Sequence, residues 1–170
     1  VMSSKWVSRL LERQVGMLDS PLINRHNLQA TLTRCKVAVA SVPALRELTV
    51  AQRERSVVLV QDAFTRYFET PFVASFIQLA HQLGYRVFLA PYSANGKPLH
   101  VQGFLGAFAK AAIRNAHQLK ALADCGVPLV GLDPAMTLVY RQEYQKVPGL
   151  NDCPKVLLPQ EWLCDALPEN

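Results

Sequence analysis

The sequence predicts an α/β protein built on an open parallel β-sheet with helices packed on both faces. Two observations carry this prediction. First, short apolar runs rich in β-branched residues occur at 56–61 (SVVLVQ), 85–91 (YRVFLAP) and 127–132 (VPLVGL), and such runs are typical of strands buried on both faces. Second, longer segments with apolar residues at helical spacing separate these runs, as expected for crossovers between parallel strands. The 170 residues, half of them hydrophobic, suffice for one buried core.

The helices expected to cover this sheet have recognisable starts and stops. Pro71 opens a segment with helical apolar spacing that Gly84 ends, as expected for proline in a first helical turn and glycine at a helix end. An alanine-rich helix is expected over about 99–124, with Gly126 just beyond it. Further elements are expected as a short helix at 133–144, a candidate fourth strand at 155–159 and a final helical turn at 160–167. The fold class is therefore α/β, with an open, Rossmann-like, three-layer parallel sheet.

The N-terminal third is expected to form a helical connector that packs on the α/β body. Apolar residues recur at helical spacing over 6–15, and a second helix is expected over 24–42, closed by Pro43. Thr49 stands where it would cap a third helical segment. The predicted organisation is a connector at 1–55 and an α/β domain at 56–170, both within a fragment of a larger chain.

Charge and hydropathy exclude several classes of protein. The net charge of +5 arises within residues 1–55, where basic side chains are dispersed along the chain. This distribution favours a solvated or partner-facing surface over a nucleic-acid site. No apolar run approaches the roughly 20 residues that span a bilayer, and the N-terminal residues lack a secretion-signal pattern. We therefore expect no nucleic-acid partner, no transmembrane segment and a cytoplasmic location, with membrane-peripheral attachment left open through the parent protein.

The cysteines do not form a metal-binding pattern. Cys35, Cys125, Cys153 and Cys164 are far apart in sequence, without a CxxC spacing or a cysteine–histidine cluster. No metal site is therefore predicted, and free thiols are expected. Cys125 follows a predicted helix and is expected to be a buried structural thiol.

Polar side chains gather in the loops that follow the three central strands. In an open parallel sheet, ligands bind beyond the carboxyl ends of the strands, near a change in strand order. If the second and third strands flank the first, the loops at 61–65, 92–97 and 133–137 converge on one crevice, with Arg141 near its rim. The ligand-crevice candidates are Asp62, Thr65, Asn95, Lys97, His100, Asp133 and Thr137.

No familiar catalytic or phosphate-binding motif occupies these loops. The first strand-to-helix turn holds no glycine, so the GxGxxG fingerprint fails, and neither GxxxxGK[ST] nor GxSxG occurs. Asp62 and Asp133 could form an acid–base pair, but each stands where it would cap the next helix, and capping is favoured. His100 has no defined partner, so no residue is assigned a catalytic role. Aromatic residues after the first strand are expected in the core or on a docking surface, with a base-stacking platform as the weaker alternative.

The same loops carry a family resemblance. The segments VVLVQDAFTRYFE, LGYRVFLAPYSANGKPLHVQGFL and GVPLVGLDPAMTLVYRQEY resemble the C-terminal, cysteine-rich (CCG-type) region of large FAD-linked, iron–sulfur oxidoreductases. This family includes enzymes of the D-lactate dehydrogenase, glycolate oxidase and D-2-hydroxyglutarate dehydrogenase types. The resemblance covers residues 3–165 and is strongest over 56–146. It implies that FAD and 4Fe–4S clusters belong to other parts of the parent protein.

The sequence departs from this family at the cluster cysteines. Where relatives carry thiolates, this chain has Asp62-Ala63-Phe64, then Ser93 to Gly96, then Asp133 to Met136. Iron–sulfur clusters need converging thiolates, normally four, so we expect the fold to be retained and the cluster lost here. The resemblance then implies a structural and docking portion of a 2-hydroxy-acid oxidoreductase, whose partners are the rest of the parent and an electron acceptor. The alternative is a self-sufficient small-molecule binding module with its ligand in the crevice.

Overall fold

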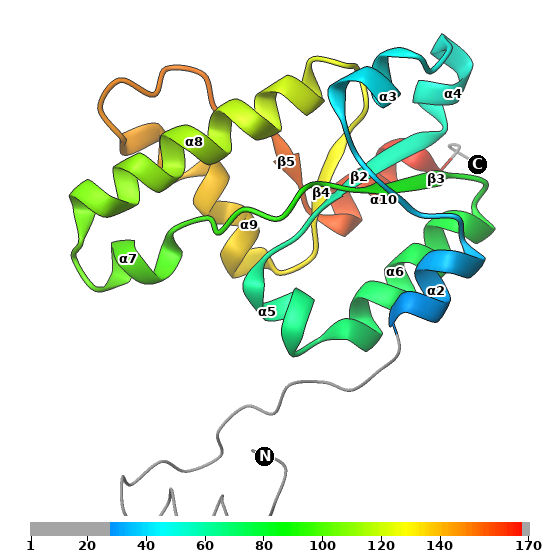
Figure 1. Cartoon of the computed structure of the whole chain (residues 1–170), viewed down its shortest axis with the longest axis horizontal. Helices are drawn as coiled ribbons and strands as arrows, with labels where there is room; N and C mark the ends of the chain where they lie inside the picture. Colours follow the sequence, from blue (N-terminus) through cyan, green and yellow to red (C-terminus); the bar gives the residue numbers. More distant parts are fainter. Residues whose placement is uncertain (1–27, 168–170) are drawn as a thin grey trace, which may run out of the picture.

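The computed structural model describes residues 28–167, and a parallel five-stranded sheet forms its centre (Figure 1). The strand order is β1-β3-β2-β4-β5, and every neighbouring pair is parallel. The predicted fold class is confirmed, and the condition for the three loops to converge is met, because the second and third predicted strands lie on either side of the first. The strands are β1 (Ala38–Val39), β2 (Ser56–Val60), β3 (Arg86–Leu89), β4 (Leu129–Gly131) and β5 (Val156–Leu157).

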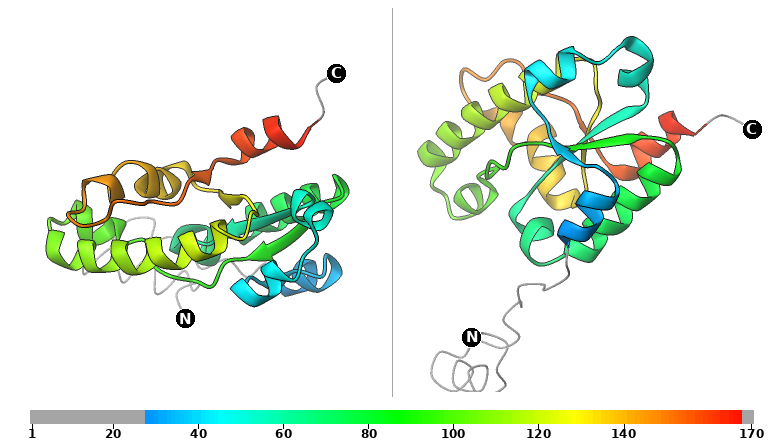
Figure 2. Two further views of the ribbon diagram at one scale, coloured as in Figure 1. Left: turned by 90° about the horizontal axis from the view of Figure 1, so that it is seen from above. Right: turned by 45° about the vertical axis from the view of Figure 1, so that its right-hand side comes forward.

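Helices cover both faces of this sheet. One face packs against α2, α6 and α10, and the other packs against α3, α8 and α9. In Figures 1 and 2, α2 lies alongside α6, with which it makes extensive contact. The helices are α2 (Leu28–Arg34), α3 (Val42–Arg46), α4 (Val50–Glu54), α5 (Ala63–Tyr67), α6 (Thr70–Gln82), α7 (Lys97–Val101), α8 (Leu105–Ala123), α9 (Pro134–Arg141), the 3₁₀ turn η1 (Tyr144–Lys146) and α10 (Pro159–Ala166).

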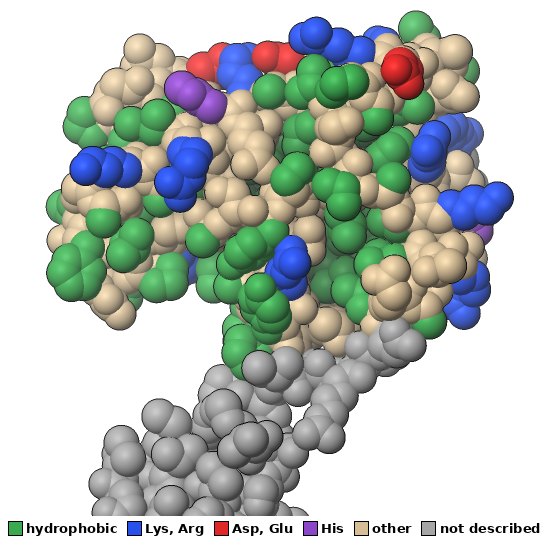
Figure 3. All heavy atoms as spheres, in the orientation of Figure 1, with side chains coloured by type: hydrophobic (Ala, Val, Ile, Leu, Met, Phe, Trp, Pro, Cys, Tyr) green, Lys and Arg blue, Asp and Glu red, His purple; other side chains and the backbone are tan. Residues whose placement is uncertain are grey.

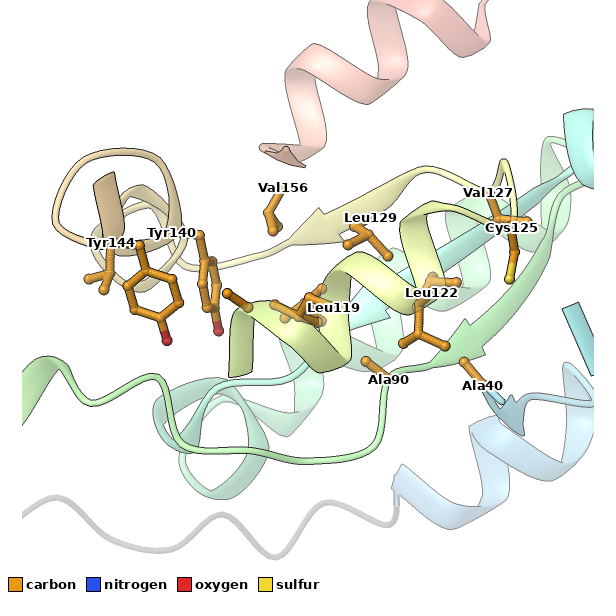
Figure 4. Close-up of a cluster of buried hydrophobic side chains, with 14 of the residues drawn as sticks. Ala40, Ala90, Leu119, Leu122, Cys125, Val127, Leu129, Tyr140, Tyr144 and Val156 are labelled. Carbon is orange, nitrogen blue, oxygen red and sulfur yellow. The ribbon is translucent and has the colours of Figure 1, made fainter. Parts of the chain in front are cut away.

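Strand β2 shows why the sequences of the central strands are continuous apolar runs. Val57 and Leu59 belong to the core on one face of the sheet, whereas Val58 and Val60 belong to the core on the other. All residues of β2 are buried, so both sides of the strand must be apolar. Figure 4 shows one of these cores, where Leu119 and Leu122 of α8 lie over the strands.

The segment between residues 24 and 42 differs from the prediction of a single helix. Helix α2 ends at Arg34, Lys36 adopts a left-handed conformation with φ 51°, and the chain then enters β1. The prediction that Pro43 closes a helix is wrong, because Pro43 lies in the first turn of α3, where its missing N–H is tolerated. Ser41 caps that helix by accepting a hydrogen bond from the Ala44 N–H at 3.3 Å. The connector thus also supplies an edge strand.

Two further boundaries bear on the predictions. The helix expected over 99–124 is divided into α7 and α8, because Gly103 adopts φ 80° between them. The predicted cap Thr49 is confirmed, since it forms a capping box with Gln52 at the start of α4. The helix expected over 6–15 lies outside the described residues. In residues 28–167, none of the helices has the length and apolar character required to cross a bilayer.

Candidate functional site

The loops after β2, β3 and β4 meet at the carboxyl edge of the sheet, as the strand order requires. The Gln61 side-chain amide donates a hydrogen bond to the Ala90 carbonyl oxygen at 2.9 Å, which joins the first two loops. The Asn95 side-chain amide donates to the Met136 carbonyl oxygen at 3.2 Å, and Lys97 Nζ donates to the Ala135 carbonyl oxygen at 2.6 Å. These bonds tie the second loop to the start of α9.

Two carboxylates of the predicted crevice are helix caps. Asp62 Oδ1 accepts hydrogen bonds from the backbone N–H groups of Phe64 at 2.7 Å and Thr65 at 2.9 Å, while its Oδ2 accepts from Thr65 Oγ1 at 2.6 Å. Asp133 Oδ1 accepts from the Met136 N–H at 2.7 Å, directly before Pro134 at the first helical position. The favoured capping role is confirmed for both aspartates. Their alternative as an acid–base pair gains no support, because these oxygens already serve α5 and α9.

A buried polar network lies behind the second loop and was not foreseen from the sequence. The Tyr144 hydroxyl donates to the Asn95 carbonyl oxygen at 2.9 Å and accepts from the Asn115 side-chain amide at 3.2 Å. Burial raises the pKa of Tyr144 above its ordinary value, and burial does the same to the pKa of neighbouring Tyr140. The Tyr144 hydroxyl is therefore a fixed hydrogen-bonding group, while the Tyr140 ring packs edge-on against the Tyr144 ring with 5.3 Å between ring centres.

Arg66 lies among aromatic side chains at the exposed side of the first two loops. Its guanidinium carbon lies 4.8 Å from the Tyr92 ring centre and 5.6 Å from that of Tyr67, and its Nη1 donates to Gln61 Oε1 at 3.3 Å. Burial raises the pKa of Tyr92, whereas the nearby Arg66 charge opposes that shift. The aromatic residues after β2 therefore differ in burial: Tyr67 is 43% exposed, whereas Phe76 is buried in the core.

Thr137 and His100 complete the predicted set, but they do not join the other side chains in an open crevice. Thr137 is buried beneath Gly131, where an added Cβ would overlap Thr137 Oγ1. His100 contacts Phe108, with 4.8 Å between ring centres and the two rings tilted by 51°. Five of the seven candidates therefore hold caps or loop-to-loop bonds, namely Asp62, Thr65, Asn95, Lys97 and Asp133.

A groove of about 490 Å³ lies beside His100, between the start of α8 and the turn η1. Most of its wall is apolar, and sequence reasoning did not identify it. The motif search was confined to loops after strands, whereas this groove forms where segments distant in sequence pack together. Its lining residues are His100, Leu105, Gly106, Phe108, Ala109, Glu143, Lys146, Val147 and Pro148.

Arg141, expected near the crevice rim, forms an ion pair that connects α9 to α10. Its Nη1 lies 2.9 Å and 2.8 Å from the two carboxylate oxygens of Glu161. Glu161 Oε2 also accepts from the Leu158 N–H at 2.8 Å. The Leu158 N–H, followed by Arg141, holds the pKa of Glu161 below its usual value.

Replacing Glu161 by glutamine is expected to reduce the pH dependence of stability in acid. Because the pKa of Glu161 is lower in the folded protein than the ordinary 4.5, its stabilising contribution is complete above that value and is lost as pH falls through the lowered pKa. The difference in urea midpoint between the original protein and Glu161→Gln should be largest near about pH 7 and shrink towards about pH 3. Exposed Glu69→Gln is the control, and a difference that stays constant over this range would contradict the prediction.

The cysteines of the chain do not converge on one point. Cys35 and Cys125 are buried in cores on opposite faces of the sheet, Cys153 packs at the margin of one core, and Cys164 is exposed on α10. The predicted burial of Cys125 is confirmed. Within residues 28–167, no three His, Cys, Asp or Glu side chains are grouped as metal ligands would be. This donor set does not fit an iron–sulfur cluster, which is normally held by four converging thiolates.

Comparison with known proteins identifies similar segments in larger enzymes. The chain is 84% identical over 169 residues to a D-2-hydroxyglutarate dehydrogenase of Pseudomonas putida, and the match covers 99% of the chain and 17% of the relative. It is 41% identical over 162 residues to a protein of that name from Escherichia coli, covering 95% of the chain and 16% of the relative. No family model and no solved structure matches. Over nearly its whole length, the chain is thus similar to a small segment of D-2-hydroxyglutarate dehydrogenases.

Proposed function

We propose that the chain is a structural and docking portion of a FAD-linked, iron–sulfur 2-hydroxy-acid oxidoreductase, and that it holds neither flavin nor cluster itself. The observation that carries this proposal is the 84% identity, over 169 residues, to a segment amounting to 17% of a D-2-hydroxyglutarate dehydrogenase. FAD would supply the two-electron oxidation of the hydroxy acid in another part of the parent, and iron–sulfur clusters would carry the electrons onward.

The geometry of the loops supports a structural role for this chain. Asp62 and Asp133 cap helices, and Asn95 and Lys97 bond neighbouring loops, so these polar groups already have partners within the fold. The thiols lie on separate elements. What the chain offers to the parent is therefore a three-layer body with outward-facing surfaces for the rest of the polypeptide or for an electron acceptor.

Single cysteine-to-serine substitutions in the full-length protein test whether this portion holds a cluster. Cys35→Ser, Cys125→Ser, Cys153→Ser and Cys164→Ser are each expected to leave iron and flavin per polypeptide unchanged, because the thiols do not converge. Iron, acid-labile sulfide and flavin are measured after anaerobic reconstitution. Exposed Cys164→Ser serves as the control for the buried sites, and circular dichroism verifies folding. Loss of iron from a folded variant would overturn this part of the proposal.

Turnover of the same preparations tests the oxidoreductase assignment. The full-length protein is expected to reduce an artificial electron acceptor with D-2-hydroxyglutarate, and absence of oxidation with any 2-hydroxy acid would overturn the assignment. Calorimetric titration of the 170-residue chain with 2-hydroxy acids and nucleotides tests the alternative role as a binding module. Micromolar binding that is abolished by Lys97→Ala would favour that alternative.

A further inference from the structure

Basic side chains gather at the edge of the sheet where three neighbouring strands begin. The strands β1, β3 and β2 are adjacent and parallel, so their first residues lie side by side. In Figure 3, Lys and Arg side chains lie along the side of the molecule where Figure 1 places α4 and the start of β3. An exposed cation stands within two residues of the start of each strand, namely Lys36, Arg86 and Arg55.

Three further arginines lie in the last turns of the helices that precede β1 and β2. They are Arg34 in α2, Arg46 in α3 and Arg53 in α4. The dipole of a helix favours a cation near its carboxyl end, which gives these three a structural role. Arg86 lies in a strand, so this role does not account for it. We call the following residues the basic edge: Arg34, Lys36, Arg46, Val50, Arg53, Arg55 and Arg86.

The cations of the basic edge have no carboxylate partner in the part of the chain that the structure describes. The ion pairs within residues 28–167 all lie elsewhere in the fold. Between residues 34 and 55, five cations outnumber the exposed carboxylates of Glu47 and Glu54. The basic edge is therefore a surface of net positive charge that is open to anionic groups from outside these residues.

Two of these cations are held in position by aromatic rings. The guanidinium carbon of Arg55 lies 5.4 Å from the ring centre of Tyr85, and that of Arg86 lies 4.7 Å from the ring centre of Phe88. The Arg86 N–H also donates a hydrogen bond to the Arg55 carbonyl oxygen at 2.8 Å, so the two arginines are neighbours. Their charges are thus concentrated at one place, which favours binding of an anionic surface there.

The composition of the basic edge fits an anionic bilayer better than an acidic protein. Its cations come from three helices and from the starts of three strands, so they present charge over a broad area. Val50 is 69% exposed and stands between Arg46 and Arg53 in the sequence. An aliphatic side chain gains nothing beside carboxylates, whereas a bilayer surface accepts cations at the lipid phosphates and aliphatic groups at the acyl chains.

We propose that the basic edge binds the surface of an anionic lipid bilayer, with lipid phosphates against its cations and Val50 at the boundary of the acyl chains. Each Lys or Arg near such a surface strengthens binding roughly fivefold, so several together hold a peripheral protein. Membrane-peripheral attachment, which the sequence leaves open, then occurs through this chain. The inference goes beyond the proposed function, because binding to a bilayer requires neither flavin nor cluster.

Flotation of the full-length protein with lipid vesicles tests this proposal. One set of vesicles contains phosphatidylcholine and phosphatidylglycerol in equal amounts, and the other contains phosphatidylcholine alone. The protein is expected to float with the anionic vesicles at low salt, to stay unbound with the neutral ones, and to dissociate as the salt concentration rises. Failure to float with anionic vesicles, or equal binding to both kinds, would overturn the proposal.

A charge-neutralised variant tests whether the basic edge is the surface that binds. Arg55→Gln combined with Arg86→Gln is expected to lower the partition coefficient on anionic vesicles at least about tenfold. Lys110→Gln combined with Arg114→Gln is the matched control, because both residues are exposed on α8 and the net charge changes equally. Circular dichroism verifies that both proteins are folded. Equal reductions in the two variants would show that net charge alone causes binding, and the assignment to the basic edge would be wrong.

Poly-glutamate is the probe for an acidic protein as the partner. If the full-length protein binds poly-glutamate but does not float with anionic vesicles, the basic edge belongs to an acidic protein and the proposal is overturned. Turnover with 2-hydroxy acids is measured without vesicles. Absence of flotation from an active protein therefore refutes lipid binding alone, whereas absence of turnover refutes the proposed function.

Discussion

Replacing Asp62 by alanine is expected to lower the free energy of unfolding by about 2–3 kcal/mol. The carboxylate is buried and accepts three hydrogen bonds, from the N–H groups of Phe64 and Thr65 and from the Thr65 hydroxyl. Alanine removes the cap of α5 and leaves the buried Thr65 hydroxyl without its partner. Urea unfolding of the 170-residue chain, followed by circular dichroism, measures the loss.

Asp133→Ala is the matched control for this prediction. Asp133 also caps a helix after a central strand, but its side chain accepts only the Met136 N–H among the described residues and is half-buried. Asp133→Ala is expected to lower the free energy of unfolding by about 1 kcal/mol, the usual effect of removing a cap. Equal losses for the two variants would contradict the burial argument. If the proposed structural role is correct, turnover per folded molecule of the full-length protein is expected to stay unchanged in Asp62→Ala, because the Asp62 carboxylate caps α5.

The central strands could be predicted because their burial leaves a sequence pattern. Both faces of β2 are covered, so every residue from Ser56 to Val60 is buried and the run is almost wholly apolar. Strand β1 leaves no such pattern, since Ala38 and Val39 are both exposed and form a two-residue edge. Its pairing with Phe88 and Leu89 depends on contacts some fifty residues away in sequence, which local periodicity does not record.

The convergence of the loops could also be predicted, whereas the hydrogen-bond partners of their polar side chains could not. Parallel strands bring their carboxyl ends to one edge, so Gln61, Asn95 and Asp133 follow from the strand order. Whether a polar group there stays free depends on partners elsewhere in the chain. Asn95 and Tyr144 are 49 residues apart, yet the Tyr144 hydroxyl bonds the Asn95 carbonyl. The groove near His100 arises in the same way, from packing of η1 against α8.

Trp162→Ala is expected to have the largest effect on stability, a loss of about 3–5 kcal/mol. Trp162 is 2% exposed and lies between α10 and the sheet, with its ring centre 5.5 Å from that of Phe76 and 5.0 Å from that of Tyr85. Alanine leaves a cavity that these rings cannot fill without moving. The substitution also removes packing that fixes α10 against the sheet. The last residue of α10, Ala166, accepts a hydrogen bond from the Tyr85 hydroxyl at 3.2 Å.

Trp162→Phe tests how much of the loss in Trp162→Ala comes from removing the aromatic ring. Phenylalanine keeps an aromatic ring between Phe76 and Tyr85 and leaves a smaller cavity, so it should lose about 1–2 kcal/mol. Urea unfolding by circular dichroism measures both variants. A loss for Trp162→Ala no greater than that for Trp162→Phe would show that α10 is held by its ion pair between Arg141 and Glu161. The larger loss is expected because that pair is partly exposed to solvent, where ion pairs contribute little, while the indole is buried.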